Sequence, residues 1–455
     1  MKKNLFQTTF YYGWVIVGLS MVSLAFWFGL RTTFSVFFVA LTDDFKWNRA
    51  DAAAAQSIAL MVYAISSPIL GSFIDRVGPR KIIVPGIILT GFGLLLCTQI
   101  ETLSQFYLFF GVIVGTGVTC LSLCPITIVL THWFEKKRGT ASGLATVGIG
   151  FSSFFFVPFF QFLINIQNWR FAYLIFSLMI FLIPLPLIAI FMRHRPQDMG
   201  MLPDGDPFEP NQGAPFQKDN SHGDSQSSLP NHEWTVRDLM KTTRFWYFIL
   251  FPSFSVSSLY IIVVHHVRYL VDLGVDKMWA ASLFAVAGAL SSGFRFFWGW
   301  LSDRVGREII FTVGEVCFAL GVLFLLLFQY SPSVVAFLYL FAFFFSAGWG
   351  VTSPMFMSIS GDLYKGRNFG LIYGMMEGGI GIGGAFGAWV AGYIFDQYHN
   401  YFWAFILAIL LNIVSIFLVW IVAPRKAFQP RIVSRDKSQK QIETGRVQSG
   451  EHEDS

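Results

Sequence analysis

Four charged residues stand inside long apolar stretches of this sequence and are its strongest candidates for chemistry: Arg31, Arg295, Glu315 and Glu377. A charge at the middle of a membrane costs about 3 kcal/mol, so such a residue usually serves a ligand, an ion pair or a proton. A guanidinium stays charged in any protein environment and matches a carboxylate in a two-pronged arrangement. Arg295 and Arg31 are therefore predicted to bind an anionic substrate. Glu377 is predicted to carry a proton.

Each of these predictions has a structural alternative. Arg295 and Glu377 are expected at similar depth, where an ion pair between them would neutralise both charges. Arg31 could instead extend to the outer membrane interface, beside two threonines. Glu315 lies closer to one end of its apolar stretch, and a structural role is favoured for it.

Two histidines and a pair of cysteines complete the set of candidate residues. His265 and His266 close a further apolar stretch, near its expected outer end. Imidazole titrates near neutral pH, so both are predicted to belong to the substrate-binding set, with plain hydration at the interface as the alternative. Cys120 and Cys124 would share a helix face, but no acidic residue or histidine accompanies them on that stretch. Packing rather than metal binding is expected for them.

The composition requires that most of the chain lies in lipid. The chain has 455 residues, of which 54% are hydrophobic and only 13% charged. A soluble domain usually has about 25% charged residues. Stretches of about 20 apolar residues are long enough to cross the hydrocarbon core as helices. We expect an all-α membrane protein with twelve transmembrane helices, at residues 12–40, 52–74, 82–100, 105–131, 140–164, 170–192, 245–267, 279–301, 309–329, 333–359, 369–394 and 402–422.

A polar stretch rich in Pro, Gly, Asp, Asn and Ser divides these helices into six plus six. The expected organisation is a six-helix half over 1–192, a flexible cytoplasmic linker over 193–243, a second six-helix half over 244–423 and a disordered tail over 424–455. Most of the 32 Lys and Arg residues fall on the side of the two termini and the linker. Because cationic loops favour the cytoplasm, both termini are expected inside, in a multi-pass protein of the inner (plasma) membrane.

Two motifs recur at nearly constant spacing, which indicates an internal duplication. The first joins spans two and three, and its residues return 228 positions later between spans eight and nine. A glycine pattern in span five returns 231 positions later in span eleven. The residues of the first motif and its copy are Gly71, Asp75, Arg76, Gly78, Gly299, Asp303, Arg304 and Gly306.

These motif residues have physical roles that their types predict. Gly78 and Gly306 permit a sharp chain reversal in a short loop. Asp75 and Asp303 stand at the membrane face, where a carboxylate can accept hydrogen bonds from the free N–H groups of a neighbouring helix start. The glycines of spans five and eleven permit close helix approach.

The two motifs resemble those of the major facilitator superfamily, and the resemblance covers residues 10–423. It implies two pseudo-symmetric six-helix halves that rock about a central cavity. It also implies that Asp75 and Arg76, with Asp303 and Arg304 in the second half, latch the halves on the cytoplasmic side. Pro79 departs from the pattern, because a basic residue often stands there.

Within that superfamily the chain resembles the bacterial monocarboxylate transporter and oxalate/formate antiporter branch. The segments that carry this resemblance are Tyr11-Tyr-Gly-Trp14, Phe28-Gly-Leu-Arg31, Val36-Phe-Phe38, Phe45-Lys-Trp-Asn-Arg-Ala50 and Ser292-Gly-Phe-Arg295. The resemblance implies that Arg295 binds the substrate carboxylate and that Arg31 stands near the place of a second basic residue. The expected activity is proton-coupled symport of a small organic anion such as lactate or pyruvate.

Three rival functions remain open. An oxalate/formate-type exchanger is disfavoured because relatives of that kind carry a lysine in span eleven, and none lies between Arg367 and Arg425. An exporter of amphiphilic compounds and a non-transporting sensor are the others. No phosphate-cradling, zinc-protease or nucleophile-elbow motif is present, so neither an ATP-driven pump nor an enzyme is expected. The expected partners are the organic anion, H+ and the lipid bilayer, with no cofactor, metal or nucleic acid, and the chain is expected to be monomeric.

Overall fold

The computed structural model describes residues 11–47, 49–205, 236–366 and 368–422, and within these ranges the chain is helical without strands. The first part of the chain contains α1 (Gly13–Phe45), α2 (Arg49–Val77), α3 (Arg80–Cys97), α4 (Leu103–Phe106), η1 (Tyr107–Val114), α5 (Gly115–Thr119), α6 (Leu123–Trp133), α7 (Arg138–Ile166), α8 (Trp169–Leu182), α9 (Pro184–Phe191), η2 (Pro196–Met199) and η3 (Pro203–Gly205). The second part contains α10 (Val236–Met240), α11 (Thr243–Asp272), α12 (Lys277–Val305), α13 (Arg307–Tyr330), α14 (Ala336–Tyr364), α15 (Phe369–Tyr398) and α16 (Phe402–Val422).

Eleven segments of the described chain are long and apolar enough to cross a membrane. Two of these segments are broken helices: α4 to α6 together, and α8 with α9. The remaining long helix, α12, has 29 residues and carries Arg295. The expected all-helical membrane fold is therefore confirmed.

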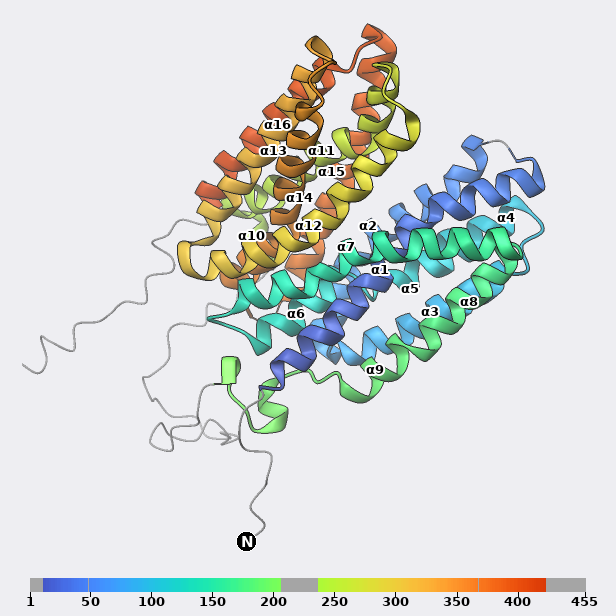
Figure 1. Ribbon diagram of the computed structural model, residues 1–455. Coiled ribbons are helices and arrows are strands. Elements are labelled where there is room, and N and C mark those ends of the chain that lie inside the picture. The colour runs from blue at the N-terminus through green and yellow to red at the C-terminus, as the bar shows by residue number, and fades with distance from the viewer. Residues whose placement is uncertain (1–10, 48, 206–235, 367, 423–455) are drawn as a thin grey trace, which may run out of the picture.

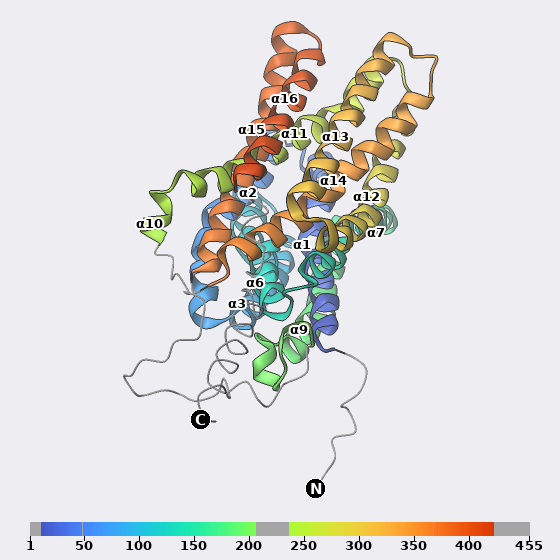
Figure 2. The same ribbon diagram turned by 90° about the vertical axis from the view of Figure 1, so that its left-hand side faces the viewer.

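The helices form two bundles that meet near one end of the molecule (Figure 1). Helices α1 to α9, blue to green, make one bundle, and α11 to α16, yellow to red, make the other. The bundles diverge toward the opposite end (Figure 1). We call the end at which the chain turns at Gly78, Lys137, Gly306 and Lys365 the linker face, because the start of α1 and the 3-10 helix η3 also lie there (Figure 2).

Glycines bring the two bundles into backbone contact. A Cβ on Gly71 of α2 would lie 1.9 Å from the Gly370 carbonyl oxygen of α15. On the other side, a Cβ on Gly299 of α12 would lie 2.3 Å from the Gly139 carbonyl oxygen of α7. Any larger residue would separate the helices, so these glycines fix how closely the halves approach at the linker face.

The start of the central linker packs against the first bundle. Within the segment predicted to be flexible, η2 and η3 are ordered against the loop between α6 and α7. The Asp204 carboxylate accepts hydrogen bonds from the backbone N–H groups of Glu135, Lys136 and Lys137 at 2.9, 2.7 and 3.2 Å. Residues 206–235 of the linker and the predicted disordered tail over 424–455 lie outside the described residues.

Candidate functional site

The two motif aspartates make equivalent contacts across the halves. Asp75 accepts hydrogen bonds from two backbone N–H groups in the first turn of α15, at 2.8 and 3.1 Å. Asp303 accepts two from the first turn of α7, at 2.8 and 2.7 Å, and a third from the Thr140 hydroxyl at 2.6 Å. These N–H groups have no partner within their own helix, and the helix dipole favours a negative charge there. Each aspartate thus joins its own half to a helix start of the other half.

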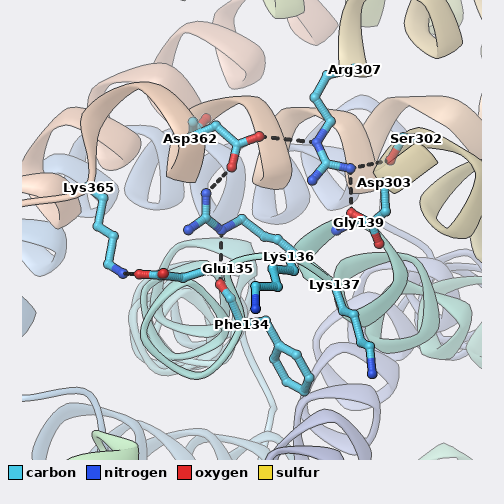
Figure 3. Close-up of polar contacts among 12 residues, drawn as sticks. Phe134, Glu135, Lys136, Lys137, Gly139, Ser302, Asp303, Arg307, Asp362 and Lys365 are labelled. Carbon is cyan, nitrogen blue, oxygen red and sulfur yellow. Dashed lines mark hydrogen bonds and ion pairs between the residues drawn. The ribbon is translucent and has the colours of Figure 1, made fainter. Parts of the chain in front are cut away.

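A buried ion-pair network reinforces the contact at Asp303 (Figure 3). Arg307 donates to Asp303 at 2.6 Å and to Asp362 of α14 at 3.1 Å. Asp362 also pairs with Arg138, which begins α7 in the opposite half. Pro79 stands at the position equivalent to Arg307 in the first half, so the Asp75 contact has no such arginine. We call these contacts of Asp75 and Asp303, with the Arg307–Asp362–Arg138 network, the latch. Its two sides are therefore different.

The rim of the latch carries one further cross-half pair. Lys365 donates to Glu135, and this hydrogen bond holds the pKa of the Glu135 carboxyl below its usual range. Both side chains line a cavity of about 560 Å3 at the linker face, together with Arg304 and Asp362. The charged contacts between the halves therefore extend from the buried ion pairs to an exposed pair at the rim of the linker face.

The basic members of the latch differ from those that the family resemblance implied. Arg76 is exposed, and Arg304 lies over the Trp300 ring at 4.0 Å. The arginines that cross or brace the halves are Arg138 and Arg307 instead. From the sequence, these two arginines indicate only which loops lie on the cytoplasmic side. A usable signal was the acid Asp303 four residues before Arg307, because such a spacing allows an ion pair.

Arg295 is a buried guanidinium without an acidic partner among the described residues. Its side chain lies in α12, about 15 Å from the linker-face end at Val305, and is 1% exposed. One terminal nitrogen donates to the Ser353 hydroxyl of α14 at 3.0 Å, and the guanidinium lies 5.9 Å from the Trp349 ring centroid. Its Nε atom has no hydrogen-bond partner. The Nε donor is thus left without a partner in the protein interior.

Arg31 does not extend to the membrane interface. Its guanidinium lies 5.3 Å from the centroids of both the Trp27 and the Tyr63 rings, in a small pocket between α1, α2 and the broken span four. Gln56 also lines this pocket, and the indole N–H of Trp27 is buried without a partner. Arg31 thus lies in a mainly apolar pocket of the first half, where its guanidinium makes cation–π contacts.

Glu377 is not paired with Arg295, although both lie at comparable depth. Its carboxylate, 1% exposed, accepts hydrogen bonds from Ser67 of α2 at 2.7 Å and from Ser122 at 3.3 Å. The Tyr63 hydroxyl also interacts with this carboxylate, and the Arg31 guanidinium lies against the Tyr63 ring. Glu377 and Arg295 therefore do not form the ion pair that their common depth allowed.

The remaining candidates lie within the second half. The Glu315 carboxylate accepts from Ser255 at 2.5 Å and from Asn412. His265 contacts the Ala388 carbonyl at 3.0 Å and the Tyr401 hydroxyl at 3.3 Å.

His266 is buried, with its Nε2 atom unpartnered. Its ring packs on Phe284, which stacks on Trp349, so two aromatic rings separate His266 from Arg295. The structure does not bring the histidines into direct contact with either intramembrane arginine.

Comparison with known proteins agrees with this architecture. The family model of the Major Facilitator Superfamily matches residues 19–360 and 291–446. Monocarboxylate transporter 13 of Bos taurus is 31% identical over 87% of this chain and 86% of its own length. The oxalate:formate antiporter of Oxalobacter formigenes is 23% identical over 90% and 92%. The fucose:proton symporter FucP of E. coli has the same fold, with a TM-score of 0.67 at 15% identity over 91% of this chain and 100% of that one. The chain belongs to the major facilitator superfamily of membrane transporters.

Proposed function

We propose that this transporter carries a small organic anion, most simply a monocarboxylate such as lactate or pyruvate, together with a proton. The observation that carries the proposal is the buried Arg295, whose guanidinium has no acidic partner among the described residues and an unsatisfied Nε atom. Desolvating a lone cation is costly, and a two-pronged carboxylate would offset that cost. The relatives named as monocarboxylate transporters and as an oxalate:formate antiporter support an anionic substrate.

The proposed cycle uses alternating access between the two halves. In the state described here the halves are latched at the linker face by Asp75, Asp303 and the Arg138–Asp362 pair. We place the linker face in the cytoplasm, because Lys and Arg are concentrated there. This state would then receive substrate from outside. Rocking of the halves would release the latch and expose the site to the cytoplasm.

Proton coupling is assigned to Glu377. A monocarboxylate brings one negative charge and a proton brings one positive charge, so their joint passage avoids electrical work of about 2.3 kcal/mol per charge per 100 mV. Glu377 is buried and touches both halves, and Arg31 lies just beyond Tyr63. We expect Glu377→Gln to retain exchange of substrate and to lose accumulation driven by a pH gradient.

Counterflow in proteoliposomes tests the proposal. Vesicles preloaded with unlabelled lactate, pyruvate, formate or oxalate should concentrate the labelled form of the accepted anion, and the Arg295→Ala variant should not. Uptake driven by an inward proton gradient without any internal anion would support symport. Strict dependence on an internal anion would support the exchanger, and no carboxylate counterflow at all would reject both.

A further inference from the structure

The face of α14 that meets Arg295 is the one open place along the inner part of this helix. All residues from 345 to 361 are buried except Trp349 and Ser353, which are partly exposed. These two residues stand four positions apart, so they lie one above the other on the same helix face. Arg295 donates to the Ser353 hydroxyl at 3.0 Å, and its guanidinium lies 5.9 Å from the Trp349 ring centroid. On this face, the buried guanidinium is therefore covered by one hydroxyl and one aromatic ring.

An aromatic surface continues from Trp349 away from the linker face. The Phe284 ring of α12 stacks on the Trp349 ring, with centroids 5.8 Å apart and ring planes at 13°. Phe284 is partly exposed as well, and it stands eleven residues, about three turns, before Arg295 on the same helix. Because α12 reaches the linker face at Val305, Phe284 lies on the side of Arg295 where the two bundles diverge. The charge therefore stands at the inner end of a surface made by two rings.

Helix α12 leaves space beside the Trp349 ring. Gly288 lies seven residues, about two turns, before Arg295, on the same side of α12. Outside its own helix, a Cβ on Gly288 would meet only the Trp349 ring, at 3.8 Å, which is an ordinary van der Waals contact. By contrast, a Cβ on Gly350, the residue after Trp349, would lie 2.6 Å from the Phe294 side chain. The two helices are thus tightly packed at Gly350 and leave room at the indole.

We propose that Trp349 and Phe284 make this transporter selective for aryl-substituted monocarboxylates. The carboxylate of such a substrate pairs with Arg295, and its aromatic ring stacks on the exposed part of Trp349. Aromatic pairs gain free energy beyond the burial of their area, and a ring beside a guanidinium adds a cation–π contact. An acid of one to three carbons is too small to bind Arg295 and to cover the indole as well. This inference rests on the proposed function and names the substrate class of the same site.

A ring that contacts the substrate can be distinguished from one that only holds the arginine. If Trp349 served only to place the Arg295 guanidinium, its loss would weaken the binding of every carboxylate by the same factor. If Trp349 contacts the substrate ring, its loss weakens the binding of an aryl acid much more than that of a small acid. The ratio of the two dissociation constants therefore separates the two roles.

Calorimetric titration of the purified full-length protein with lactate and with phenyllactate measures this ratio. The two acids share the carboxylate and the neighbouring hydroxyl and differ by one phenyl ring. Phenyllactate should bind at least about tenfold more tightly than lactate. The acid with a cyclohexyl ring in place of the phenyl ring should bind more weakly than phenyllactate, because a saturated ring offers no π face to the indole or the guanidinium.

Variants of the two rings and a matched control make the test specific. Trp349→Leu, which keeps an apolar side chain without a ring, should lower the preference for phenyllactate to below about threefold. Trp349→Phe should retain most of the preference, and Phe284→Leu should lower it by a smaller factor than Trp349→Leu. Trp403→Leu is the control, because Trp403 of α16 is 55% exposed and makes its ring contact with the adjacent Phe402. It should leave both dissociation constants unchanged.

Equal affinity for lactate and phenyllactate in the unaltered protein would overturn the inference and leave the proposed function standing. An unchanged ratio in Trp349→Leu, or an equal loss for both acids, would also overturn it. If Trp349→Leu does not fold, Phe284→Leu and the cyclohexyl acid decide. Absence of binding and of counterflow for every carboxylate would reject the proposed function and this inference together.

Discussion

Asp303 and Asp75 occupy equivalent positions of the repeat, yet only Asp303 is held by an arginine. Both carboxylates cap the first turn of a helix in the opposite half. Arg307 adds a 2.6 Å ion pair to Asp303, whereas Pro79 stands at the equivalent place near Asp75. The two sides of the latch therefore have different strengths, and the side at Asp75 is expected to part first.

Neutralising the two aspartates should show this difference. Asp75→Asn keeps the shape of the cap and loses its charge, so the closed population at the linker face should fall about fivefold. Asp303→Asn should lower it by a factor of at least ten, because Arg307 also loses one of its two carboxylates. The distance between spin labels on cysteines introduced at Lys81 and Met240, which are exposed in opposite halves, reports both populations. Equal effects of the two substitutions would refute the asymmetry.

Asp362 should be a stability determinant because it neutralises two buried arginines. Asp362→Asn leaves Arg138 and Arg307 short of a counter-charge, and we expect a loss of about 3 kcal/mol in the free energy of unfolding. Glu135→Gln is the matched control, since it breaks a cross-half pair whose members are largely exposed, and a loss below about 1 kcal/mol is expected. Thermal unfolding of the purified variants in detergent measures both. A loss at Asp362 no larger than at Glu135 would contradict the prediction.

Asp204, which lies at the start of the linker, should stabilise the closed state of the latch. Its carboxylate holds three backbone N–H groups of the loop that carries Glu135 and leads into Arg138. Asp204→Asn should lower the closed population about fivefold in the same distance measurement. Asp198→Asn is the control, because Asp198 accepts a hydrogen bond from the neighbouring Arg195 backbone and not from the loop that leads into α7 in the described part of the chain, and it should have no effect. If both variants behave alike, the linker does not act on the latch through Asp204.

Arg295→Lys should retain the fold and lose most of the anion affinity. A lysine ammonium is a point charge and cannot reproduce a two-pronged contact with a carboxylate. We expect at least a tenfold rise in the KM for the transported anion, with normal expression and thermal stability. Transport with wild-type KM would remove Arg295 from the site.

The pH dependence of the latch near neutrality should not come from Glu135. The hydrogen bond from Lys365 lowers the pKa of Glu135, so this pair is fully formed above the ordinary pKa of a glutamate and is lost only as pH falls through the lowered value. Glu135→Gln should therefore leave the closed population unchanged in its response between neutral and mildly acidic pH. A changed response in this variant would show that Glu135 titrates in this range and would contradict the prediction.

Sequence alone was enough to place the motif residues, because their roles depend on local chemistry. Hydropathy set the class and the spans, and the repeat located Asp75 and Asp303 at the ends of helices where free N–H groups are available. The positive φ angles of Gly78 and Gly306, +89° and +119°, follow from the short loops in which these glycines lie. Such features require only the period of a helix and the steric limits of a turn.

The partners of the buried charges were decided by the tertiary structure. Sequence distance from the helix ends gave Arg295 and Glu377 a common depth, but depth does not fix the rotation of a helix about its axis. The packing of α2 on α15 turned Glu377 toward Ser67 and Ser122. In the same way, Arg138 and Asp362, 224 residues apart, meet only because the two halves are closed at the linker face. Side chains that face one another across a moving interface are set by the relative position of the halves, and a single sequence does not contain that position.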